Sequence, residues 1–127
     1  VKAFLDTVID FFVSVDLVKY RLQTHTTLTC LRGIFALYQT TQEKKYLKIV
    51  EEKFAFYVKN GMTLTYENFN WFGRKDTWTE PCAVVDSFIL ATELYNLTKE
   101  ENYKTLARRI WFNGLQFCQR ELLLFRR

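Results

Sequence analysis

The stretch that decides the fold is LYQTTQEKKY, which occupies residues 37–46. A second stretch of the same design, LYNLTKEENY, occupies residues 94–103. Leu, Tyr, Thr, Glu and Tyr recur between the two at one constant offset of 57 residues. A unit of this length, in which one apolar helical pattern passes through a short polar turn into another, is typical of a two-helix hairpin repeat.

The flanking segments carry apolar residues at helical spacing on both sides of each turn. Thr40 with Glu43, and Thr98 with Glu101, also fit the Thr-x-x-Glu capping box that opens a helix. We therefore expect five main helices, which lie at about 2–15, 25–39, 43–59, 81–96 and 99–119.

Helices joined by short turns pack antiparallel and bury their apolar stripes against one another. The expected fold is therefore all-α, with residues 1–127 forming a single domain of about two and a half antiparallel hairpins, a partial toroid. Such an arc is open. Its end must be covered by missing sequence, by a self-associating partner chain, or by the apolar tail at residues 122–125. Residues 121–127 fit the repeat poorly, so the pattern does not show whether they are native.

Composition excludes several classes of protein. Gly 4 and Pro 1 are too few for a β sandwich or barrel with many turns. The 18 basic and 14 acidic residues are interspersed along most of the chain, which argues against a nucleic-acid partner. No apolar run approaches the ~18 residues that a membrane span needs. The sequence opens on Val1 with neither an initiator methionine nor the charged start of a signal peptide, so it predicts no compartment.

The cysteines and the long loop bear on chemistry. Three widely spaced cysteines are neither a disulfide framework nor a self-contained zinc site. The loop at about 62–80 has no helical period, and a loop of this length in a helical domain is usually functional. It combines flat aromatics, which stack on sugar rings, with Glu67, Arg74 and other polar groups that bind hydroxyls. The alternative is that these aromatics plug the hairpin junction as core.

The loop leads into a polar cluster at the start of the fourth helix. Pro81 favours a helix start, so Cys82 lies where unpaired N–H groups and the helix dipole favour a thiolate. Glu80 and Asp86 flank Cys82 on the same face. The repeat offset places Cys82 on the position of His25, the single histidine, which opens the second helix. Two equivalent helices thus begin with a ligand-capable side chain. The alternative is a small cysteine beside a capping carboxylate, with His25 as an ordinary structural residue.

The segments 23–33, 67–74 and 79–82, together with the two turns, resemble the six-hairpin glycosidases over roughly residues 20–120. The nearest likeness is to the β-L-arabinofuranosidase type. The resemblance implies an (α/α)6 barrel, of which this chain supplies less than half. It also implies that a Glu-x-Cys pair, here Glu80 and Cys82, binds zinc together with two adjacent later cysteines. His25 matches a sugar-contacting histidine, and Glu67 falls in the acid/base region. The sequence departs from the family in having no Cys-Cys pair.

We therefore expect a carbohydrate-active protein resembling a glycoside hydrolase, with a carbohydrate as its ligand. The expected catalytic carboxylates are Glu67, Glu80 and Asp86. The expected substrate-binding residues are His25, Arg74, Trp71 and Trp78, and zinc is the candidate metal at Glu80 and Cys82. Two alternatives stay open. One is a non-catalytic helical-repeat module that binds protein or glycan, and the other is an unsaturated uronyl hydrolase that relies on Asp86 without a metal.

Overall fold

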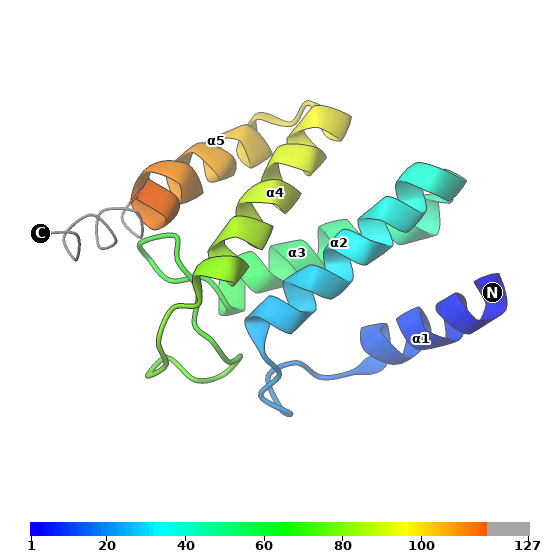
Figure 1. The fold of residues 1–127 in the computed structure, drawn as a ribbon, viewed down its shortest axis with the longest axis horizontal. Coiled ribbons are helices and arrows are strands. Elements are labelled where there is room, and N and C mark those ends of the chain that lie inside the picture. The colour runs from blue at the N-terminus through cyan, green and yellow to red at the C-terminus, as the bar shows by residue number, and fades with distance from the viewer. Residues whose placement is uncertain (117–127) are drawn as a thin grey trace, which may run out of the picture.

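A computed structural model describes residues 1–116, and this part of the chain contains helices and no strands (Figure 1). The elements are α1 (Lys2–Ser14), α2 (Thr24–Thr41), α3 (Lys44–Asn60), α4 (Pro81–Thr98), α5 (Glu101–Arg109) and η1 (Ile110–Leu115). The predicted all-α fold of antiparallel helical hairpins is confirmed. None of the described helices is long and apolar enough to cross a membrane.

The hairpins α2–α3 and α4–α5 follow the sequence repeat residue for residue. α4 begins and ends 57 residues after α2, and α5 begins 57 residues after α3. The residue after each first helix, Gln42 or Lys99, has a left-handed backbone with φ 59° or 61°. Its N–H donates to Tyr38 O at 2.7 Å or to Tyr95 O at 2.8 Å. Both helices therefore end in the same left-handed cap.

The predicted capping boxes are wrong. Thr40 lies inside α2 and Thr98 is the last residue of α4, where each hydroxyl donates to the carbonyl four residues earlier at 3.0 Å and 2.8 Å. α3 and α5 begin after Glu43 and Glu100, whose side chains make no capping hydrogen bond. Threonine hydroxyls readily bond back to the preceding turn of their own helix, so these residues close the first helices and do not open the second ones.

Figure 1 shows α2 and α4 side by side and running in the same direction, while α3 and α5 return antiparallel to them. We call α2 and α4 the inner helices and α3 and α5 the outer helices. α1 lies on the side of α2 away from α4. Asp6 ties α1 to α3 by accepting from Lys45 Nζ at 2.8 Å and Tyr46 Oη at 2.6 Å. The completely buried core includes Leu28, Leu31, Val50, Tyr57, Phe72, Val84, Leu90, Leu94 and Ile110.

The fifth helix departs from its predicted form. α5 ends at Arg109 and continues as the π-helix η1. Gly114 lies in η1 against the long loop, where a Cβ atom would be 2.8 Å from Tyr66 O and 2.9 Å from Val84 Cγ1. The wider turn of a π-helix and the missing side chain together let the loop approach this closely. The rest of the predicted helix, with Cys118 and residues 121–127, lies outside the described residues.

Candidate functional site

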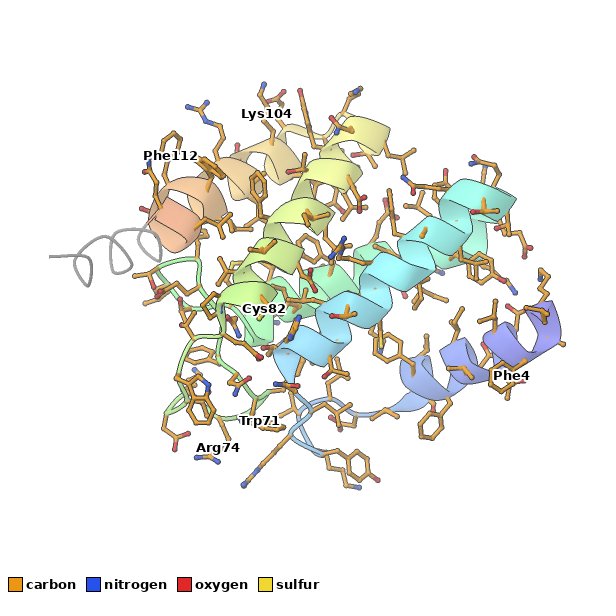
Figure 2. All side chains as sticks on the ribbon, viewed as in Figure 1. Phe4, Trp71, Arg74, Cys82, Lys104 and Phe112 are labelled. Carbon is orange, nitrogen blue, oxygen red and sulfur yellow. The ribbon has the colours of Figure 1, made fainter. Side chains whose placement is uncertain are left out.

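The first turns of the two inner helices bring the predicted site residues together. His25 and Cys82 are each the second residue of their helix. Ligand atoms of His25, Glu80 and Cys82 all lie within 4.8 Å of one another. Figure 2 shows Cys82 at the start of α4, beside the start of α2. We call the group formed by these three residues and Asp86 the rim cluster.

Equivalent positions of the two hairpins contact each other at this rim. Gln23 Nε2 donates to Glu80 Oε2 at 3.0 Å, and Thr29 Oγ1 donates to Asp86 Oδ2 at 3.0 Å. The members of each pair are 57 residues apart, which is the repeat offset. The inner helices are therefore in register, and the positions that the repeat equates face each other across the site.

His25 lies between the two carboxylates of the cluster. Its Nδ1 is 3.5 Å from Glu80 Oε1, and its Nε2 is 3.5 Å from Asp86 Oδ2. The ring therefore has a carboxylate oxygen beside each of its two nitrogens, and these two contacts hold its orientation.

Asp86 is the buried anchor of the cluster. Its side chain is 8% exposed, and Arg32 Nη1 donates to its Oδ1 at 2.6 Å. The Thr29 hydroxyl and the His25 ring approach its other oxygen. A buried carboxylate is tolerated only when it is paired and hydrogen-bonded, and a charge-assisted bond from arginine is a strong one. The buried Asp86 carboxylate therefore orients the side chains of His25 and Thr29.

Glu80 connects the rim cluster to the long loop. Besides accepting from Gln23, its Oε2 accepts from the Asn70 amide nitrogen at 2.9 Å when that amide is oriented to satisfy both its neighbours. The Asn70 oxygen then accepts from Trp78 Nε1 at 3.3 Å. The Trp78 side chain is 69% exposed. An open indole is thus linked to the cluster carboxylate through one buried amide.

The remaining predicted residues lie outside the rim cluster. Glu67 accepts from Thr65 Oγ1 at 2.9 Å and lines a separate pocket beside η1. Arg74 is exposed and pairs with Asp76, Nη2 to Oδ2, at 2.8 Å. Trp71 is half-buried, and its backbone pairs with that of Gln23 in an isolated bridge. The structure therefore assembles His25, Glu80, Cys82 and Asp86, but neither Glu67 nor Arg74.

Four residues of the site had no predicted role: Gln23, Thr29, Arg32 and Asn70. The repeat could have predicted the contacts of two of them. Gln23 and Thr29 precede Glu80 and Asp86 by the same 57 residues that relate His25 to Cys82. The contact between Arg32 and Asp86 spans 54 residues and has no such signal. Asn70 is brought in by the path of the loop.

The rim cluster offers a cysteine sulfur, an imidazole nitrogen and a carboxylate oxygen, which is a donor set that suits zinc. Zinc bonds of about 2.0–2.3 Å hold neighbouring tetrahedral donors ~3.5 Å apart, so the observed spread of up to 4.8 Å requires only a small contraction. Three protein ligands with a fourth position open is the arrangement of catalytic zinc sites. The residues present therefore fit a zinc ion, and His25 takes a place that the sequence resemblance assigned to cysteine.

Comparisons with known proteins identify no relative. No family model matches the chain, and searches of curated proteins and of solved structures found no similar protein. The function is therefore inferred from the residues of the rim cluster and from their geometry.

Proposed function

We propose that this protein is carbohydrate-active and resembles a glycoside hydrolase, with the rim cluster as its site. The observation that supports this most directly is the convergence of His25, Glu80 and Cys82 at the starts of two equivalent helices. Trp78, the exposed indole, is linked into the same hydrogen-bond network. An aromatic platform beside polar and ionisable groups suits a ligand that has both apolar ring faces and hydroxyls.

The proposed sugar subsite lies between Trp78 and Glu80. The hydrogen bond from the indole N–H to Asn70 limits how the Trp78 ring turns, and the same amide holds Glu80. A sugar stacked on the ring would therefore meet the carboxylate and the His25 imidazole with its hydroxyls. Asp86 is the positioning residue of this subsite, because it is buried and fixes His25 from the far side.

Cleavage of a glycosidic bond needs one group that donates a proton and another that attacks or activates water. In the proposed site Glu80 exchanges the proton. Cys82 is exposed in the first turn of α4, beside Glu80. Alternatively, a zinc ion held by His25, Glu80 and Cys82 would supply Lewis acidity at the open side of the cluster, and Glu80 would then be a ligand and not the proton donor.

A non-catalytic sugar-binding role is the second candidate. It is favoured by the saturation of the carboxylates, since both Glu80 and Asp86 already accept from neighbouring side chains. A polar network that is satisfied without a ligand is typical of a rigid recognition surface. The two candidates differ in turnover and not in binding.

The test combines a panel of aryl pyranosides and furanosides with intrinsic tryptophan fluorescence. We expect the wild-type protein to hydrolyse at least one glycoside and Glu80→Gln to lose on the order of a hundredfold or more of the rate. Cys30→Ala is the matched control, because Cys30 is an exposed thiol outside the rim cluster. Sugar-dependent fluorescence without hydrolysis would favour the binding role. If the protein shows no hydrolysis and no sugar-dependent fluorescence change, the carbohydrate proposal is refuted.

Metal content is measured on the same proteins, purified without chelator, by elemental mass spectrometry. Stoichiometric zinc is expected in the wild type and in Cys30→Ala, and its loss is expected in His25→Ala and Cys82→Ala. Zinc retained by both rim variants would show that the ion is bound elsewhere.

A further inference from the structure

An apolar groove separates α1 from α2. It encloses a cavity of about 460 Å³, and its walls are almost entirely apolar. α1 contributes Leu5, Val8, Ile9 and Phe12, and α2 contributes Cys30, Gly33, Ile34, Ala36, Leu37 and Thr40. The groove lies on the side of α2 away from α4 (Figure 1) and does not include the rim cluster.

The repeat allows the α2 side of the groove to be compared with the equivalent positions on α4. Adding the offset of 57 to the six α2 residues of the groove gives four positions on α4 that are completely buried, Ser87, Leu90, Ala91 and Leu94, and two that are not, Glu93 and Leu97. On this side α4 differs from α2 in having another inner helix, α2 itself, packed beside it. On α2 itself, Cys30 and Gly33 are exposed and Leu37 is half-buried. The groove is therefore the equivalent of an interface that is filled one repeat later.

We propose that the groove between α1 and α2 binds the inner helix of a further hairpin, which runs parallel to α2 as α2 runs parallel to α4. The occupant is an amphipathic helix with an apolar stripe of the kind that α2 presents. A second folded copy of this chain cannot supply that stripe from α2, because Leu28, Leu31 and Phe35 are already buried in it. The proposed occupant is therefore a helix of another polypeptide that carries such a stripe.

Gly33 gives independent support for a close helix neighbour. It lies in the middle of α2, where glycine costs roughly 1 kcal/mol relative to alanine. Nothing lies within 4 Å of the place where its Cβ would be, so no contact within the described chain explains the missing side chain. A helix seated in the groove would approach α2 at this point, and glycine would let the two backbones come close.

The experiment uses the full chain and a synthetic peptide with the sequence of residues 23–42, since α2 is the helix that fills this place in the next repeat. The peptide carries Ser in place of Cys30. Alkylation of the protein is followed at each cysteine by peptide mass mapping. We expect saturating peptide, at about ten times its Kd, to slow alkylation of Cys30 on the order of tenfold. Cys82, which lies at the rim, is the internal control and should not change.

Two matched variants locate the binding. Gly33→Arg can be accommodated in the free chain because its surroundings are open, and it should abolish peptide binding measured by fluorescence anisotropy. Thr105→Arg, an exposed position on α5, should bind as the wild type does. A peptide with Leu28→Asp and Leu31→Asp should give no protection.

Three results would overturn the proposal. They are unchanged alkylation of Cys30 at all peptide concentrations, equal slowing at Cys30 and Cys82, and protection of Cys30 that rises with protein concentration in the absence of peptide. The last result would identify a second copy as the occupant. The alkylation is carried out with a chelator and without sugar, so that metal or sugar bound at the rim cluster does not protect Cys82 and the comparison with Cys30 tests the groove alone.

Discussion

The pair formed by Arg32 and Asp86 should respond asymmetrically to removal of either partner. The Asp86 side chain is 8% exposed, whereas that of Arg32 is 43% exposed. Arg32→Met keeps the aliphatic stem but leaves a buried carboxylate without its guanidinium. Asp86→Asn leaves the guanidinium free to turn into water and keeps an oxygen that can accept from it. We therefore expect the arginine variant to be the less stable of the two.

The magnitude follows from the environment of each group. Removing one partner of a fully buried ion pair costs about 3–5 kcal/mol. Arg32 is partly in water, and Asp86 keeps the Thr29 hydroxyl and the His25 ring, so we expect a loss of about 2 kcal/mol for Arg32→Met. Asp86→Asn exchanges a charged acceptor for a neutral one and should cost about 1 kcal/mol. For a domain of this size the arginine variant should melt roughly 8 °C lower than the wild type.

The assay is urea unfolding followed by far-UV circular dichroism, at one pH and ionic strength for all variants. The double variant Arg32→Met/Asp86→Asn should be more stable than the sum of the single losses predicts, by at least about 0.5 kcal/mol, because residues in contact are coupled. Additive losses, or a larger loss for Asp86→Asn than for Arg32→Met, would refute the inference that the carboxylate is the buried and dependent partner.

Two further comparisons test the helices and the attachment of α1. Gly33→Ala should raise the free energy of unfolding by about 1 kcal/mol, because the space around Gly33 is open. Gly114→Ala should lower the free energy of unfolding, because the new Cβ would lie 2.8 Å from the Tyr66 carbonyl oxygen. Equal effects of the two substitutions in thermal melts would contradict this. Hydrogen bonds from Lys45 and Tyr46 hold the pKa of Asp6 below its ordinary value, so the stability it contributes is present above about pH 4 and is lost as the pH falls. The difference in unfolding midpoint between the wild type and Asp6→Asn should therefore shrink from pH 5 to pH 2, and a constant difference would exclude this contribution.

The sequence repeat was sufficient to predict the hairpins because their limits are set locally. Helical spacing of apolar residues and the polar turn at Gln42 and Lys99 determine where each helix ends. The capping boxes failed because a threonine near a helix boundary can serve either helix, and its spacing to a glutamate does not distinguish the two. The π-helix η1 arises from a contact between Gly114 and the loop, which no periodicity reveals.

The repeat predicted which helix residues lie close together, but no sequence pattern predicted which loop residues reach them. The repeat offset placed His25 opposite Cys82, and Glu80 and Asp86 followed from helix geometry. The path of residues 61–80 is set by distant backbone pairings, such as Phe69 N–H to Gly61 O at 2.8 Å and Phe72 N–H to Leu22 O at 3.0 Å. These pairings decide that Asn70 reaches Glu80 while Glu67 and Arg74 do not. No local pattern in the loop encodes that choice.

The register of the inner helices limits how a duplicated hairpin can become a site. Two identical hairpins would set each rim side chain against its own copy. Glutamate would then oppose glutamate at the height of Glu80, and aspartate would oppose aspartate at the height of Asp86, both with like charges in contact. In this protein the two hairpins instead have opposite hydrogen-bonding roles. The acceptors Glu80 and Asp86 belong to the start of the second hairpin, and the donors Gln23, Thr29 and Arg32 belong to the start of the first.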